Sequence, residues 1–198
     1  MKLKFKLTAK FLQLAEVVEG ELPVEDTDQE FSGKGTSLLP SQMKSGRPAL
    51  FTKPISWPVG GRVFDMGAGR PEMVEGLKAF FADKQITYLP YDKFNGATYN
   101  GNTLAELKKE KADVATASNL LNVIPGVENR LVVLKQMYNA LKPGGKVYIT
   151  VHHTSGKEPG QSGADKWQNH MPPAKYLDEI KQIFPDAKVT SGMIVATK

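Results

Sequence analysis

Residues 62–69 read Arg-Val-Phe-Asp-Met-Gly-Ala-Gly, a short apolar run that ends in an acidic residue and a glycine-rich turn. Pro71 follows, and proline is favoured at the first position of a helix, where Glu72 and Glu75 also suit the positive end of the helix dipole. The stretch therefore predicts a strand, a tight turn and a helix. Such a turn brings backbone N–H groups close to a ligand.

The alternation of strands and helices continues downstream of this turn. We expect strands at 86–91, 113–118 and 146–151, helices at 104–111, 131–141 and 176–184, and a closing hairpin at 188–191 and 193–197. Thr103 and Glu106 have the spacing of a capping box for the helix over 104–111. The pattern predicts a Rossmann-like α/β fold with a doubly wound, mostly parallel sheet and a C-terminal antiparallel hairpin. A ligand crevice is then expected at the carboxyl ends of the strands.

The segment between Asp92 and Asp113 is short for such a fold, with 20 residues in between. It has room for a loop and one helix, so we expect the third strand of the usual order to be missing or vestigial. The loop over 95–102 then becomes a candidate for contacts that the lost strand end would have made.

The chain divides near residue 58 into an N-terminal extension, 1–58, and an α/β domain, 59–198. Alternating apolar residues predict a short strand over 2–7, and a helical stripe follows over 11–18. The stretch from 20 to 58 is mostly loop, with a turn of helix near 49–51. Thr36 and Ser37 end a polar, glycine-containing segment and are candidates for contact with a substrate.

Composition narrows the function classes. The chain has 198 residues, no Cys and a net charge of +5. The lack of Cys excludes a disulfide scaffold, a Cys-ligated metal site and a cysteine nucleophile, and we expect no metal.

No apolar run is long enough to span a bilayer and no secretory signal is evident, so we expect a cytoplasmic protein with no membrane partner. Residues 31–64 hold five basic residues and no acid, which leaves nucleic acid open as a partner, although a solvated face is the favoured interpretation.

Polar clusters fall at the ends of four successive predicted strands: Asp65 to Gly69, Asp92, Ser118 with Asn119, and His152 with His153. The glycine turn does not fit a dinucleotide site, because Glu72 stands where the third glycine would be and would repel pyrophosphate. The pattern D-x-G-x-G suits a ligand with an ammonium group. Asp92, 23 residues beyond Gly69, has nearly the spacing at which a strand-end acid reaches ribose hydroxyls.

The chain resembles the class I S-adenosylmethionine-dependent methyltransferases over about residues 60–155. The resemblance rests on residues 63–69, Tyr91-Asp92, 113–124 and 141–149. A closer likeness is to small methyltransferase-like proteins of bacteriophages and to those encoded near DNA-phosphorothioation loci, through residues 91–95, 118–124, 35–37 and 48–51.

The resemblance implies S-adenosylmethionine as the cofactor and assigns roles by position. Asp65 would hold the methionine ammonium directly or through water, and Gly67, Ala68 and Gly69 would pass under the ligand. Asp92 would accept hydrogen bonds from the ribose hydroxyls, and Lys93 and Phe94 would lie along the adenine. Ser118 and Asn119 would face the methionine part. The acid that often reads the adenine amino group from the third strand has no obvious counterpart here.

The acceptor stays open as a small molecule, nucleic acid or protein, and the oligomeric state is not predicted. Cytosine C5 methylation is excluded by the lack of Cys, and residues 118–121 lack the tetrad typical of exocyclic amino methylation of DNA. His152 and His153 are candidates for a general base, with a preference for His152. Asn122, Trp167 and Gln168 are further acceptor-side candidates. The alternative function is a non-catalytic S-adenosylmethionine-binding regulatory or partner protein, and a nicotinamide oxidoreductase is the least supported reading.

Overall fold

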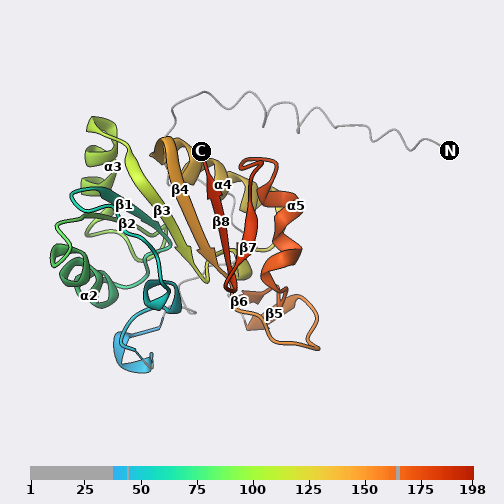
Figure 1. The fold of residues 1–198 in the computed structure, drawn as a ribbon. Helices are drawn as coiled ribbons and strands as arrows, with labels where there is room; N and C mark the ends of the chain where they lie inside the picture. Colours follow the sequence, from blue (N-terminus) through green and yellow to red (C-terminus); the bar gives the residue numbers. More distant parts are fainter. Residues whose placement is uncertain (1–37, 44, 164–165) are drawn as a thin grey trace.

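A six-stranded sheet organises the computed structural model, which describes residues 38–43, 45–163 and 166–198 (Figure 1). The strand order is β2-β1-β3-β4-β8-β7. The strands are β1 (Arg62–Met66), β2 (Thr87–Tyr91), β3 (Ala112–Ser118), β4 (Leu141–Thr150), β7 (Lys188–Thr190) and β8 (Met193–Thr197). The strand and helix predicted over 2–7 and 11–18, together with Thr36 and Ser37, lie outside the described residues.

The sheet is parallel from β2 to β4 and antiparallel beyond it. β1 pairs in parallel with both β2 and β3, and β3 pairs in parallel with β4. The last two strands, β8 and β7, form an antiparallel hairpin that pairs with β4 through β8. This confirms the predicted mostly parallel α/β sheet with its C-terminal hairpin.

Helices cover both faces of the sheet, which explains why its central strands are buried on both sides. The helices are α2 (Pro71–Ala82), α3 (Asn100–Lys109), α4 (Val127–Ala140) and α5 (Leu177–Ile180), with 3-10 turns η2 (Pro40–Gln42), η3 (Ala49–Thr52), η4 (Leu121–Val123) and η5 (Pro173–Tyr176). Side chains of α2 and η3 pack on one face, and those of α3, α4 and α5 pack on the other. None of the helices in these described ranges is both long and apolar enough to cross a membrane.

The helix predicted over 131–141 begins at Val127 and ends at Ala140, and two other predicted helices also have boundaries other than expected. The helix predicted over 104–111 begins at Asn100, so Thr103 lies inside it and is not a cap; its hydroxyl donates to the carbonyl oxygen of Pro90 at 2.6 Å. The helix predicted over 176–184 is a 3-10 turn followed by the short α5. In both places contacts with other elements decide the boundary.

β2 forms one edge of the described sheet, so the predicted loss of the third strand is confirmed there. At the carboxyl end of β2, backbone groups on the outer side bond to side chains of α3 instead of a neighbouring strand. The Asn100 carboxamide accepts from the Asp92 N–H at 3.0 Å and donates to the Asp92 carbonyl at 2.8 Å, while Thr103 bonds Pro90. Pro90 itself has no N–H to satisfy.

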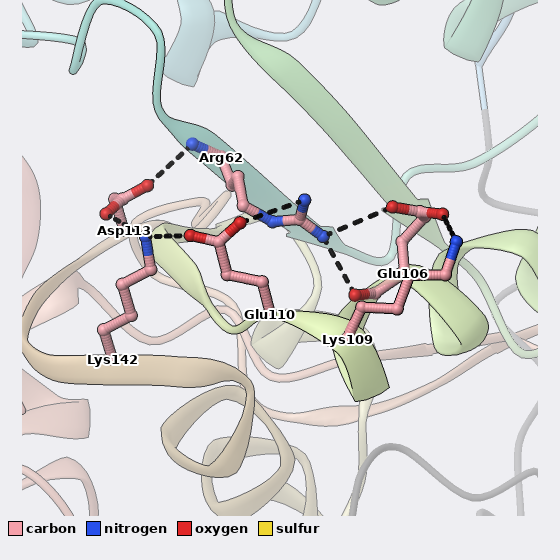
Figure 2. Close-up of polar contacts among 6 residues, drawn as sticks. All are labelled: Arg62, Glu106, Lys109, Glu110, Asp113 and Lys142. Carbon is pink, nitrogen blue, oxygen red and sulfur yellow. Dashed lines mark hydrogen bonds and ion pairs between the residues drawn. The ribbon is translucent and has the colours of Figure 1, made fainter.

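Charged side chains join the elements at the amino end of the sheet (Figure 2). The Arg62 backbone N–H donates to Asp113 Oδ2 at 2.8 Å, and its guanidinium donates to the Glu106 carbonyl at 3.0 Å. Lys142 Nζ lies 2.8 Å from Glu110 Oε1 and 2.9 Å from Asp113 Oδ1, and these contacts raise its pKa. The network ties the starts of β1, β3 and β4 to the end of α3, at the end of the sheet opposite to the carboxyl ends of these strands.

Candidate active site

A cavity opens at the carboxyl ends of β1, β2 and β3, where the sequence predicts a ligand crevice. Figure 1 shows the segment that carries η2 and the hairpin of β5 (Gly160–Gly163) and β6 (Lys166–Gln168) at this same end of the sheet. The cavity is lined by Leu38, Met43, Pro48, Met66, Gly67, Ala68, Gly69, Met73, Tyr91, Asp92, Lys93, Phe94, Ser118, Asn119, Leu120, Val123, Ile124, Val133 and Gln136. Eight of the nine residues proposed from the sequence for the cofactor are on this lining, and Asp65 is the exception.

The glycine turn forms one wall of the cavity. Gly67 and Gly69 have φ of 78° and 84°, a region that glycine adopts at little cost. The N–H groups of Gly67 and Ala68 both donate to the Tyr91 carbonyl, at 2.7 and 3.0 Å, which fixes the turn against the end of β2. A Cβ on Gly67 would lie 2.9 Å from Leu120 Cδ1, so a side chain there would require the Leu120 side chain to move.

The Asp92 carboxylate joins this turn to the loop after β2. Its Oδ2 accepts from the Gly69 N–H at 2.9 Å, and its Oδ1 accepts from the N–H groups of Phe94 and Asn95 at 2.9 and 2.8 Å. The residue is only 7% exposed and lines the cavity. The next two side chains also line it, with Lys93 Nζ 5.7 Å from the centre of the Phe94 ring. One acidic group thus orients both loops that border the cavity.

Asp65 lies behind the turn instead of on the cavity wall. It is 2% exposed; Oδ2 accepts from the Tyr88 hydroxyl and Oδ1 from the Thr116 hydroxyl, both at 2.7 Å. Burial raises the pKa of Asp65 to about 7, although the two hydrogen bonds act in the opposite direction. The carboxyl that the motif places beside the ligand is thus held inside the protein by two neighbouring strands.

Ser118 and Asn119 form the wall at the end of β3. The Ser118 hydroxyl lies 3.3 Å from the Thr150 hydroxyl, and the Asn119 N–H donates to the Thr150 carbonyl at 2.8 Å. Asn119 has a φ of 54°, in the left-handed region that asparagine tolerates better than most residues. The chain therefore turns sharply here and keeps both residues on the lining.

Asn122, Trp167 and Gln168, proposed for the acceptor side, lie near one another and do not line the cavity. The buried Asn122 accepts from the His152 N–H at 3.2 Å and donates to Gln168 Oε1 at 3.3 Å, and Gln168 Nε2 donates to the His152 carbonyl at 3.0 Å. Trp167 Nε1 donates to Asn169 Oδ1 at 2.7 Å. These bonds join β6 to η4 and to the end of β4. The side chains of His152 and His153 are exposed, and neither residue lines the cavity.

Sequence reasoning missed two parts of the lining. Leu38, Met43 and Pro48 come from the segment predicted to be mostly loop, and they line the cavity together with Met73 of α2. Val133 and Gln136 come from α4, on a flank of that helix other than the stripe that predicted it. No local motif marks either set, because tertiary packing brings each of them to the cavity.

Comparison with known proteins assigns the family. The model of a methyltransferase domain family matches residues 37–187 of the chain. The match spans well over half of the sequence, so the chain belongs to this family of methyltransferase domains. The expected class of enzyme, a methyltransferase, is thereby confirmed.

Among solved structures, 161 chains resemble this one. An S-adenosylmethionine-dependent methyltransferase from Mesorhizobium loti is 15% identical, with a TM-score of 0.45 and coverage of 76% of this chain and 96% of that one. Human N-acetylserotonin methyltransferase is 14% identical, with a TM-score of 0.45 and coverage of 72% and 49%. The S-adenosylmethionine-dependent methyltransferase SibL is 16% identical, with a TM-score of 0.45 and coverage of 70% and 50%. The chain spans about half the length of the last two proteins. No curated protein sequence matches it.

Proposed function

We propose that the chain holds S-adenosylmethionine in the cavity at the ends of β1, β2 and β3 and transfers its methyl group to an acceptor that enters from the same end of the sheet. The observation that carries the proposal is the 2.9 Å hydrogen bond from the Gly69 N–H to Asp92 Oδ2, which brings the glycine turn and the strand-end acid together on one cavity. The family supplies the reaction class.

The lining fits the proposed ligand. The glycine turn offers a wall without side chains at Gly67 and Gly69, against which a ligand can approach the backbone closely. Asp92 offers a carboxylate to ribose hydroxyls, and Lys93 and Phe94 follow it along the wall toward the place proposed for the adenine. Ser118 and Asn119 are assigned to the methionine part. Asp65 lies behind the turn and supports it through hydrogen bonds from Tyr88 and Thr116.

Bound S-adenosylmethionine supplies a methyl group on a positively charged sulfur, which a nucleophile attacks in line with the departing sulfur. The chain's own contribution is to align the two groups and to exclude water, and this alignment supplies much of the catalysis. An acceptor that carries a proton also needs a base. We assign that role to His152, with His153 as the alternative, because both follow directly after β4 at the cavity end of the sheet.

A non-catalytic protein that binds the same cofactor is the second candidate. The observation that favours it is the position of the two histidines, since neither residue lines the cavity. Both candidate proteins bind S-adenosylmethionine, but only the first transfers its methyl group to an acceptor.

Two measurements in sequence test the proposal. Titration calorimetry of the purified chain with S-adenosylmethionine and S-adenosylhomocysteine should show one site, and Asp92→Ala should weaken it. Incubation with S-adenosylmethionine and fractionated cell extract or nucleic acid should then release S-adenosylhomocysteine. Binding without release in every fraction would favour the non-catalytic protein, and no binding of either compound would refute both.

Three narrower assignments belong to the same proposal. The likeness of residues 91–95 and 118–124 supports a place among the methyltransferase-like proteins of bacteriophages or of phosphorothioation loci. The contribution of Leu38, Met43 and Pro48 to the cavity supports an extension, 1–58, that completes the site of the domain 59–198. The composition supports a cytoplasmic location.

A further inference from the structure

Gln136 of α4 is a buried polar residue whose side chain forms no hydrogen bond within residues 38–43, 45–163 and 166–198. Eleven polar or charged residues are buried in the part of the chain that the structure describes: Asp65, Asp92, Asn100, Thr103, Thr116, Asn122, Arg130, Gln136, Thr150, Asn169 and Glu179. The other ten hydrogen-bond through their side chains, as Asn100 does to Asp92 and Arg130 does to Glu179. Gln136, only 8% exposed, forms no such bond there.

The same residue lines the cavity of the proposed active site. Its carboxamide oxygen and nitrogen are not among the described polar atoms that the fold seals away from water without a partner, so they reach the cavity. A carboxamide that faces a cavity and bonds to no described protein group can bond to a ligand there.

The surroundings of Gln136 indicate the chemistry of that ligand. Met66, Val133 and Ile124 give the cavity apolar walls, and Asp92 supplies its acidic group. A ligand that suits both has a hydroxyl-bearing part for the carboxylate and a flat body with a polar edge for the carboxamide. Adenosine has this composition, and its base carries a donor at N6 beside acceptors at N1 and N7.

We propose that Gln136 recognises the 6-amino edge of the adenine of S-adenosylmethionine. A carboxamide donates and accepts at the same time, so it matches this donor–acceptor pair. The inference rests on the proposed function and adds a specificity-determining residue to it. Gln136 supplies this contact from α4, because the described sheet ends at β2 and has no further strand on that side.

The test compares S-adenosylhomocysteine with its 6-deamino analogue, in which purine replaces adenine, by titration calorimetry. The wild-type chain should bind the analogue about tenfold more weakly, the ratio typical of one lost hydrogen bond. Gln136→Leu, which keeps the volume and removes the polar group, should bind the two compounds equally. Val133→Ala is the matched control: it also changes the cavity lining on α4, and it should weaken both compounds while leaving their ratio at about tenfold.

Each outcome bears on the inference. A wild-type chain that binds both compounds equally would overturn it, and so would a Gln136→Leu variant that keeps the wild-type ratio. A wild-type chain that binds S-adenosylhomocysteine without discriminating the analogue leaves the proposed function standing, whereas one that binds neither compound overturns both. Thermal unfolding of the ligand-free variants shows whether they fold, and Gln136→Met replaces Gln136→Leu if the latter does not.

Discussion

The Tyr88 hydroxyl donates a 2.7 Å hydrogen bond to Asp65 Oδ2 across the paired strands β2 and β1. The bond holds the acidic residue of the D-x-G-x-G motif inside the protein, where Thr116 supplies a second donor. Asp65 therefore fixes the end of β1, directly before the glycine turn in the sequence.

Asp65 should make the stability of the protein pH-dependent. Burial raises its pKa from 3.8 to about 7 in the folded state. The folded state thus binds more protons than the unfolded state between about pH 4 and pH 7, and stability falls as the pH rises through this window. From pH 5 to pH 8 the loss due to Asp65 should be about 2–3 kcal/mol. Urea unfolding of wild type and Asp65→Asn at both pH values measures it, since the variant lacks this titration; parallel pH profiles would contradict the prediction.

Gly67→Ala should destabilise the turn and weaken cofactor binding. Gly144→Ala is its matched control, because the two glycines have φ of 78° and 77° but only the Cβ at 67 has a close neighbour, Leu120. Backbone strain should cost each variant about 1–2 kcal/mol. Gly67→Ala should lose more than that and bind S-adenosylhomocysteine more weakly, whereas Gly144→Ala should bind as wild type does. Equal thermal shifts and equal affinities for the two variants would show that the close contact is relieved at no cost.

Asp92→Ala should weaken S-adenosylmethionine binding by about 1–3 kcal/mol, the loss expected for hydrogen bonds to a charged group. The substitution also releases the Gly69 and Phe94 N–H groups, so the loops at 67–69 and 93–95 should exchange their amide hydrogens faster. Asp83→Ala, at the exposed C-terminal end of α2, is the control and should change neither property. Unaltered calorimetric affinity in a folded Asp92→Ala variant would remove Asp92 from the site.

His152→Ala should lower the rate of methyl transfer by about 10²–10⁴-fold, the usual contribution of a positioned base. Donor affinity should stay as in wild type, because His152 does not line the cavity. Single-turnover assays of His152→Ala and His153→Ala, once an acceptor is found, make the comparison. Wild-type rates for both variants would show that alignment alone suffices or that the base lies elsewhere.

Arg130→Met should destabilise the protein by about 3–5 kcal/mol, because it leaves the buried Glu179 carboxylate without its partner. Arg130 Nε and Nη2 each donate to Glu179 at 2.8 Å, and the two side chains are 5% and 7% exposed. The double variant Arg130→Met/Glu179→Leu should recover most of the loss. A double variant that is no more stable than Arg130→Met in urea unfolding would argue against this explanation.

Local patterns predicted the parts of the molecule whose structure depends on nearby residues. The β1–turn–α2 unit follows from the apolar run, Gly67, Gly69 and Pro71, all within ten residues. The start of α3 did not follow, because Thr103 looks like a cap in sequence and only the folded chain brings its hydroxyl to Pro90. The type of a side chain thus shows that it can form a hydrogen bond, but it does not show which group becomes its partner.

The candidate site divides in the same way. Asp92 and the residues at the end of β3 were expected from strand ends, because parallel strands bring their carboxyl ends to one edge. Asp65 was expected beside the ligand, and the alternation of side chains along β1 together with Tyr88 and Thr116 places it behind the turn. Gln136 carried no sequence signal, since a glutamine in an amphipathic helix is typical of the solvent face.

The bonds from Asn100 and Thr103 to the outer side of β2 have a consequence for self-association. A bare strand edge offers a row of backbone donors and acceptors on which a second chain can add a strand, the usual first step of edge-to-edge aggregation. In this sheet α3 occupies those groups at Pro90 and Asp92, and the ring of Pro90 removes one donor altogether. The backbone groups at Pro90 and Asp92 are therefore not available to a strand of a second chain, because Asn100 and Thr103 of α3 already bond to them.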